Sequence, residues 1–336
     1  MIPPRIVRRL VVAPVVLIVC AALIAASPVG LTAALIYDLL TRSNLRATRA
    51  VLFFAYYLVL EIVGIVYLAL LWLAGGTGFK LKSQLMQRAH YAYMRWWLRR
   101  LRGAAARLFR LRIEIHDPPQ PRWGPVLVFS RHAGPGNSLM LVGTLMLEYR
   151  RLPRIVMLSK LQWDPLIDIV GNRLPNRFIH HGPAHSEQSR QVVAELAADT
   201  TDDSAFILFP EGRDFTDKLR LRAIAHLRTR GHLDRADKAE RMMRVLPPRH
   251  GGVAAAVGAA PEADVVFVAH TVLEDVGSFG ELFNRIPFTR PVAARYWRIP
   301  NSEVPDDPDE LIDWLYGWWE RIDSWILSQI QRQSND

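Results

Sequence analysis

The sequence predicts an α/β domain with a mixed central sheet flanked by helices, preceded by two transmembrane helices. Two long stretches near the amino terminus are almost free of charge, and after residue 112 short β-rich runs alternate with helical patterns. Hydrophobic residues make up 50% of the chain and charged residues 22%, which is typical of folded rather than disordered proteins. The 336 residues leave room for about two domains.

The two uncharged stretches form an expected membrane anchor over residues 1–79. Leu10 to Tyr37 contains 28 residues without a charge, and Ala50 to Phe79 contains 30 with Glu61 as its only charge. Each exceeds the roughly 20 residues that cross a bilayer as a helix. A cleaved signal peptide is the alternative for the first stretch, but apolar sequence continues well past a candidate cleavage site at residues 25–27.

The net charge of +10 comes from one segment, residues 80–112, which holds ten basic residues and no acidic one. Apolar and aromatic side chains lie among these cations, so we expect a basic amphipathic segment at the interface with anionic lipid. An ordinary solvated helix that follows a membrane span is the alternative. The larger positive charge on this side predicts an integral membrane protein whose residues 80–336 are cytoplasmic. No nucleic-acid recognition motif accompanies the charge, and we expect no nucleic-acid partner.

Residues 113–305 show the α/β pattern. Apolar runs such as VLVF and FILF are typical of strands buried on both faces. The predicted strands are Arg112–His116, Pro125–Ser130, Arg154–Ser159, Arg177–His180, Ala205–Phe209, Asp264–Thr271 and Val292–Arg298. The predicted helices are Ser138–Arg150, Ser186–Ala198, Phe215–Thr229 and His250–Ala260, and the proline-rich stretch Asp117–Pro125 is expected to be a loop.

Residues 306–336 form a predicted amphipathic helix with several tryptophans at helical spacing after an acidic start. We expect it to pack on its own domain, with a second membrane-surface anchor as the alternative.

Polar residues follow two of the predicted buried strands. Ser130-Arg131-His132 leaves the first strand, and a histidine at a strand's carboxyl end can act as a general base, although a lone histidine is more often structural. Pro210-Glu211-Gly212-Arg213 leaves the second, where a glycine and an arginine suit a phosphate. The alternative for this second segment is a surface turn in which Glu211 and Arg213 pair with each other.

Metal chemistry is not expected. Cys20 is the only cysteine, which excludes a disulfide framework and cysteine-rich metal centres. His180, His181 and His185 lie close in sequence but lack a recognised ligand spacing.

Five sequence blocks resemble, in their order and spacing, those of the glycerolipid acyltransferase family, which includes lysophosphatidic acid acyltransferases. The blocks are H-x-x-x-x-N from His132, LSKLQWDP, NRFIHHG, LFPEGR and VLPPRHGG. The resemblance covers about residues 113–275. It implies that His132 is the general base, with position 137 beside it in the catalytic site. It also implies that the acceptor phosphate is bound by Glu211, Gly212, Arg213 and Arg177.

The resemblance implies a membrane-bound enzyme of the 1-acylglycerol-3-phosphate O-acyltransferase kind. It would move a fatty acyl group from acyl-CoA or acyl carrier protein to the free hydroxyl of a lysophospholipid, converting lysophosphatidic acid to phosphatidic acid. Its partners would be membrane lipids, the lysophospholipid acceptor and the acyl thioester donor, with no cofactor.

Three positions depart from the family pattern. Asn137 replaces an aspartate that orients the base, His180-His181 stand where an arginine is expected, and Arg213 directly follows Gly212. An asparagine carries no charge, although its carbonyl oxygen can accept a hydrogen bond from the imidazole. A catalytically impaired family member that acts as a lipid-binding or scaffold protein is therefore the alternative function.

Overall fold

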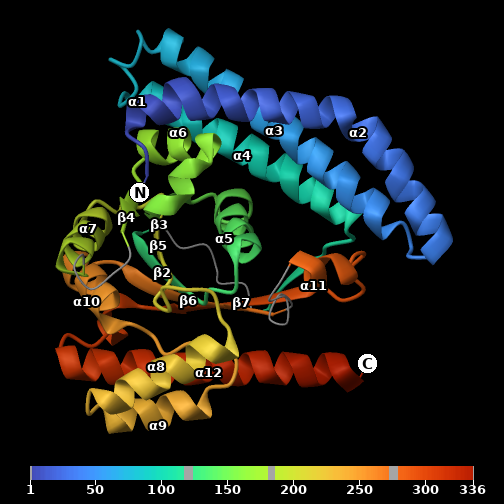
Figure 1. The fold of residues 1–336 in the computed structure, drawn as a ribbon. Coiled ribbons are helices and arrows are strands. Elements are labelled where there is room, and N and C mark those ends of the chain that lie inside the picture. Colours follow the sequence, from blue (N-terminus) through green and yellow to red (C-terminus); the bar gives the residue numbers. More distant parts are fainter. Residues whose placement is uncertain (1, 117–123, 181–185, 272–278, 336) are drawn as a thin grey trace. The chain divides into compact units, whose positions relative to one another are not determined.

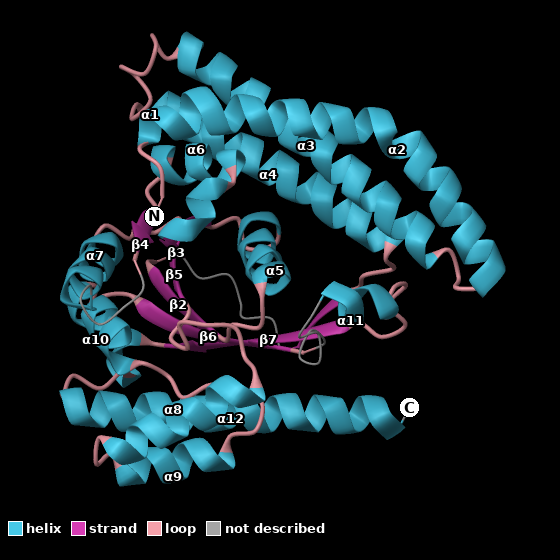
Figure 2. Cartoon of the chain, viewed as in Figure 1, coloured by secondary structure: helices cyan, strands magenta, loops and turns pink. Residues whose placement is uncertain are grey.

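The computed structural model describes residues 2–116, 124–180, 186–271 and 279–335 (Figure 1). The chain divides into two compact units. The amino-terminal unit combines Met1–Leu111, Met157–His181 and Phe279–Thr289, and the sheet unit combines Arg112–Val156, Gly182–Ser278 and Arg290–Asp336. The predicted fold class is confirmed, because a mixed sheet flanked by helices follows two long apolar helices (Figure 2).

The amino-terminal unit begins with the two apolar helices. The first starts as α1 (Arg5–Val7), passes through the π-helical segment η1 (Arg8–Val12) and continues as α2 (Ala13–Thr41). The second is α3 (Arg46–Ala74). Both are long and apolar enough to cross a membrane by length and composition.

The turn between α2 and α3 is organised by Asp38, which is buried. Its carboxylate accepts hydrogen bonds from the main-chain N–H groups of Ala47 at 3.0 Å and Thr48 at 2.8 Å, and from the Ser43 hydroxyl. These bonds satisfy main-chain donors at the start of α3 that have no partner within the helix.

Helix α4 (Gln84–Leu108) contains most of the basic residues of the 80–112 segment and packs along α3. Aromatic pairs join the two helices: the rings of Tyr67 and Tyr93 lie 5.0 Å apart and those of Tyr57 and Trp97 lie 6.3 Å apart. The apolar face of this amphipathic helix is thus partly covered by the unit itself.

Four short elements complete the amino-terminal unit: η2 (Ser159–Trp163), α6 (Pro165–Arg173), β4 (Arg177–Ile179) and α11 (Phe279–Asn284). The carboxylate of Asp168 in α6 is buried and pairs with Arg8 at 2.9 Å and Arg9 at 3.2 Å. At the other end of the hairpin, Arg46 donates to the carbonyl of Ile286 at 3.1 Å. Charged contacts therefore hold three distant segments of sequence together.

The sheet has the strand order β1-β7-β6-β2-β5-β3-β4. Its strands are β1 (Ile113–His116), β2 (Val126–Ser130), β3 (Leu152–Leu158), β5 (Ser204–Leu208), β6 (Asp264–His270) and β7 (Val292–Ile299), with β4 as given above. The strand β2 is parallel to both neighbours, β5 and β6, and every one of its residues is buried. The β6–β7 pair is antiparallel, which makes the sheet mixed.

Helices cover both faces of the sheet. They are α5 (Pro135–Leu147), α7 (Ser186–Ala198), α8 (Asp217–Thr229), α9 (Leu233–Arg241), α10 (His250–Ala259) and α12 (Pro308–Asn335). Figure 1 shows α5 and α12 on opposite faces. The ring of Phe267 in β6 lies 4.8 Å from Trp318 and 5.1 Å from Trp314 of α12. The carboxyl-terminal helix therefore packs on its own domain, as expected from its sequence.

Candidate functional site

The two motif segments predicted from the sequence meet at one edge of the sheet. His132 follows β2, and Glu211-Gly212-Arg213 follows β5, which is the parallel neighbour of β2. The main-chain N–H of Phe215 donates a hydrogen bond of 3.1 Å to the carbonyl of His132. The imidazole ring of His132 lies 4.6 Å from the ring of Phe209. Both loops thus emerge at the carboxyl ends of parallel strands, where α/β sheets bind ligands.

A carboxylate that the sequence analysis did not single out lies beside His132. The Nδ1 atom of His132 is 3.1 Å from Oδ1 of Asp214, the residue that follows Arg213. The side chains of His132 and Asp214 are 21% and 54% exposed. The base candidate is therefore partly accessible and has an acidic partner from the neighbouring loop.

Asn137 lies in the first turn of α5 and is buried. Its Nδ2 donates to the carbonyl of Ala133 at 2.9 Å, and its Oδ1 has no hydrogen-bond partner in the described part of the chain. The expected bond from the imidazole to this oxygen is thus not present. The amide stabilises the start of its own helix.

A group of buried polar side chains lies behind the site. Arg131 is fully buried and donates to the carbonyls of His270 at 3.1 Å and Arg244 at 2.6 Å. Burial raises the pKa of Glu211 to about 8, although the positive charge of Arg131 opposes the shift. Burial, assisted by Arg131, lowers the pKa of His270 to about 3. At neutral pH Glu211 is therefore mostly protonated and His270 is neutral.

Glu211 and Arg213 do not form the surface pair considered as an alternative. Glu211 is buried whereas Arg213 is exposed, and no ion pair joins them among the described residues. The turn instead directs the carboxyl group of Glu211 into the domain and the guanidinium of Arg213 toward solvent.

Gly212 adopts a left-handed backbone with φ of +69°, next to a second arginine. A Cβ placed on Gly212 would lie 3.3 Å from Nη1 of Arg249. The main-chain N–H of Arg249 donates to the carbonyl of Pro210 at 2.9 Å, which fixes this residue against the turn. Burial, and then the charge of Arg213, lower the pKa of Arg249. Two cations therefore flank the glycine, and within residues 186–271 neither forms an ion pair.

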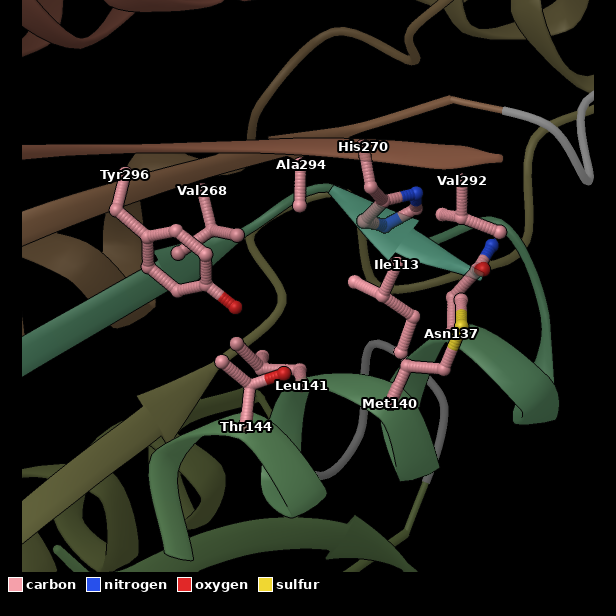
Figure 3. Close-up of a pocket in the computed structure, with 10 residues that line it drawn as sticks. All are labelled: Ile113, Asn137, Met140, Leu141, Thr144, Val268, His270, Val292, Ala294 and Tyr296. Atoms are coloured by element: carbon pink, nitrogen blue, oxygen red, sulfur yellow. The ribbon is translucent and has the colours of Figure 1, made fainter. Parts of the chain in front are cut away.

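A small apolar pocket of about 20 Å³ lies between α5 and the sheet (Figure 3). Asn137 and His270 lie at one end of it, and Thr144 and Tyr296 at the other. The hydroxyl of Tyr296 shares a hydrogen bond with Thr144. The remaining lining residues are Ile113, Met140, Leu141, Val268, Val292 and Ala294. The pocket begins near the candidate base and is lined by aliphatic side chains.

Arg177, predicted to bind the acceptor phosphate, belongs to the amino-terminal unit rather than to the sheet unit that holds the other predicted site residues. It is exposed on β4, and its Nη1 donates to the carbonyl of Asn176 at 3.3 Å. In the same unit the hydroxyl of Ser159 lies 2.9 Å from Nδ1 of His180. The described residues contain no group of three or more His, Cys, Asp or Glu placed to hold a metal, and His181 and His185 lie outside those residues.

Asp214 and Arg249 are the residues that sequence reasoning missed. Asp214 directly follows the block LFPEGR and Arg249 lies inside the block VLPPRHGG, so their position next to these blocks is the signal that could have identified them. Only the meeting of the β2, β5 and α10 loops shows that they face His132 and Gly212.

Comparisons with known proteins found no matching family model and no matching curated protein. Among solved structures, the chain is similar to the crystal structure of the 1-acyl-sn-glycerophosphate (LPA) acyltransferase, PlsC, from Thermotoga maritima. That match has 13% sequence identity and a TM-score of 0.42, and it covers 80% of this chain and 95% of the other.

Proposed function

We propose that this chain is a membrane-bound acyltransferase that moves a fatty acyl group from a thioester to the free hydroxyl of a lysophospholipid. Lysophosphatidic acid is the proposed acceptor, and acyl-CoA or acyl carrier protein is the proposed donor. One observation carries the proposal: His132 and the Gly212-Arg213 turn lie on adjacent strand ends and are joined by the Phe215–His132 main-chain bond. A base beside an anion-binding turn is what the acylation of a phosphate-bearing alcohol requires.

His132 acts as the general base in this reaction. Its Nε2 takes the proton of the acceptor hydroxyl while the hydroxyl oxygen attacks the thioester carbonyl carbon. The tetrahedral intermediate collapses, the carbon–sulfur bond breaks, and the thiolate leaves and receives the proton from His132. One ester and one thiol are formed, so the reaction needs no metal ion or cofactor.

Arg213 and Arg249 hold the acceptor phosphate. The guanidinium of Arg249 lies beside Gly212, Arg213 is the next residue along the turn, and the missing side chain of Gly212 lets an anion approach the main chain. Arginine is well suited to this role because its planar fork can donate two parallel hydrogen bonds to phosphate oxygens. Protonated Glu211 adds no negative charge beside the anion.

The apolar pocket beside Asn137 is the proposed site for the end of the acyl chain, and at about 20 Å³ it would have to widen to admit that chain. Its aliphatic lining offers no charge to the thioester donor, and its near end lies at the residues that flank the candidate base. Apolar clefts with few polar groups are typical of sites for such ligands.

Helices α2 and α3 attach the enzyme to the membrane in which its acceptor resides. Their length and apolar composition suit this role, and the arginines of α4 would attract anionic lipid. The acceptor carries an acyl chain and partitions into the bilayer, so attachment raises its concentration at the site. A cytoplasmic catalytic domain is part of the proposal.

The test is acyl transfer from labelled oleoyl-CoA, or oleoyl acyl carrier protein, to lysophosphatidic acid in isolated membranes. We expect His132→Ala to lower the rate by about 10²- to 10⁴-fold, the range that general-base catalysis contributes. His226→Ala, an exposed histidine of α8, is the matched control and should retain activity. Equal activity in His132→Ala, or no transfer with either donor, contradicts the proposal.

The rival function is a lipid-binding or scaffold protein without turnover, suggested by Asn137. It predicts lysophospholipid binding without acyl transfer in the chain as given, and transfer that emerges only in Asn137→Asp. The Asp214 carboxylate beside His132 favours the enzyme, because the charge missing at position 137 is present on the opposite loop.

A further inference from the structure

A histidine that works as a base needs a partner on its other ring nitrogen. An acceptor at Nδ1 fixes the tautomer whose Nε2 is ready to take a proton, and a negative charge there stabilises the imidazolium as it forms. Asn137 does not supply this partner, since its Nδ2 donates to the Ala133 carbonyl and its Oδ1 has no hydrogen-bond partner in the described chain. Another residue must do so if His132 is the base.

Asp214 has the required position. Its Oδ1 lies 3.1 Å from Nδ1 of His132, an ion-pair contact whose geometry falls short of a hydrogen bond. The aspartate therefore stands on the side of the imidazole where a tautomer-fixing acceptor belongs.

The loop that carries Asp214 is fixed on both sides. Before it, the N–H of Gly212 donates to the carbonyl of Phe209 at 3.0 Å. After it, the N–H of Phe215 donates to the carbonyl of His132 itself, and Thr216 caps α8 by accepting from the N–H of Leu219 at 3.2 Å. The bond from Phe215 ties the residue next to the aspartate to the residue that carries the imidazole. These main-chain contacts hold the loop that carries Asp214 next to His132.

We propose that Asp214 is the positioning residue of His132 and replaces the carboxylate that is absent at position 137. The inference rests on the proposed function. In the reacting complex Asp214 accepts a hydrogen bond from the Nδ1–H of the neutral imidazole, a bond of the kind that catalytic sites often align only once substrate is bound. The acceptor proton moves to Nε2 and then to the leaving thiolate, so no proton passes to Asp214.

The partial exposure of Asp214 makes this role separable from folding. Solvent-exposed ion pairs contribute little to stability, so removing the charge should leave the fold intact. Solvent also screens the attraction, so the catalytic effect should be smaller than the roughly 10⁴-fold loss that the same change causes in a buried serine-protease triad.

The experiment compares the full chain with Asp214→Asn, Asp214→Glu and the control Asp217→Asn. Asp217 is an exposed aspartate three residues further along, in the first turn of α8. We expect Asp214→Asn to lower kcat by about 10- to 100-fold with both KM values within about twofold and an unchanged melting temperature. Asp214→Glu should recover most of the rate, and Asp217→Asn should match the unaltered chain.

A second measurement does not depend on turnover. Long-range ¹H–¹⁵N correlation spectra of the histidine rings in detergent report which nitrogen carries the proton, with His132→Ala used to assign the signal. We expect His132 to be protonated on Nδ1, and Asp214→Asn to shift the population toward the other tautomer.

The outcomes separate the inference from the function. An unchanged kcat and tautomer in Asp214→Asn, in a chain that His132→Ala inactivates, overturns the role of Asp214 and leaves the acyltransferase standing. A rise in acceptor KM alone also overturns it, because that result places Asp214 in acceptor binding. If neither donor supports transfer but Asp214→Asn shifts the tautomer as expected, the proposed reaction is overturned. The pairing of Asp214 with His132 then still stands.

Discussion

The guanidinium of Arg249 lies against the α-carbon of Gly212, so that a Cβ at this position would meet Nη1 at 3.3 Å and Cζ at 3.4 Å. The glycine is also left-handed, with φ of +69°. The backbone conformation favours glycine at this point of the turn, and an added methyl group would press on the Arg249 side chain, so the two effects can be tested separately.

Gly212→Ala should cost stability and weaken acceptor binding. A left-handed alanine costs roughly 1–2 kcal/mol, and the added methyl group displaces Arg249. Gly231→Ala is the matched control, since φ there is +77° but nothing lies within 4 Å of the added carbon. We expect a similar fall in melting temperature in both variants and a raised acceptor KM in Gly212→Ala alone. An equal acceptor KM in the two variants would show that Arg249 does not bind the acceptor.

Arg249→Ala and Arg213→Ala should each raise the KM for lysophosphatidic acid. Hydrogen bonds to charged groups contribute about 1.5–3 kcal/mol, which corresponds to roughly 10- to 100-fold in affinity. If the phosphate is held equally before and during the reaction, kcat changes little. Arg241→Ala is the control, because that exposed arginine pairs with Glu320 at 2.7 Å away from the turn. With monoacylglycerol, an acceptor without phosphate, the variants should behave like the unaltered chain; a parallel loss there contradicts phosphate binding.

Glu211→Gln should change how stability depends on pH. The pKa of Glu211 is raised to about 8 in the folded chain, while an unfolded glutamate releases its proton near its ordinary pKa of 4.5. Unfolding therefore releases a proton between these values, and this contribution to stability is full below pH 4.5 and is lost as the pH rises through 8. We expect the melting temperature of Glu211→Gln, relative to the unaltered chain, to rise steadily at pH 5, 7 and 9. A constant difference across this range would show that the carboxyl group is not buried in its neutral form.

Asp168→Ala should destabilise the amino-terminal unit. The Asp168 carboxylate is buried and pairs with both Arg8 and Arg9, and breaking a buried pair from one side costs roughly 3–5 kcal/mol. Asp234→Ala, an exposed aspartate in the first turn of α9, serves as the control. Thermal unfolding in detergent measures the difference; equal midpoints in the two variants would mean that the ion pairs do not hold α6 to the start of the first helix.

Substitutions in the pocket should move the acyl-chain preference in opposite directions. Ala294→Leu adds carbon atoms to the pocket that Figure 3 shows and should favour shorter chains, while Met140→Ala removes atoms and should favour longer ones. Competition between donors of different chain length, measured as product ratios, gives the shift without an absolute rate. Ratios that are unchanged in both variants would exclude the pocket as the site of the acyl chain.

The strands of the sheet could be predicted from the sequence because burial on both faces makes them continuous apolar runs. Each of the seven strands begins and ends within two residues of its predicted bounds. The helices α6, α9 and α11 are not predicted from the sequence, and α6 and α9 show why. The first is short, and the second is strongly charged and buries only Ala236 and Ala239, so neither shows a wide apolar stripe.

The candidate site could be predicted in part. His132, Gly212 and Arg213 each follow a strand that the sequence makes evident, and strand ends are where ligands bind. The roles of Asp214 and Arg249 in the site cannot be predicted in this way, because they depend on which loops face each other. The β2–β5 pairing and the path of the chain into α10 decide this arrangement. The sequence shows an uncharged Asn137 after His132, whereas the three-dimensional arrangement places the carboxylate of Asp214 beside that histidine.

The amino-terminal unit is built from three separate stretches of sequence, and this limits how the chain can be shortened. A shortened chain that begins near residue 113 keeps every strand but removes the arginines that neutralise Asp168 and the contact from Arg46 to Ile286. It also removes the Leu68 carbonyl that accepts from Arg173 at 2.7 Å. Two inserted stretches, 157–181 and 279–289, would then fold without their partners. A water-soluble variant is better obtained by replacing exposed apolar side chains on α2, such as Ile18 and Leu40, than by cutting the helices away.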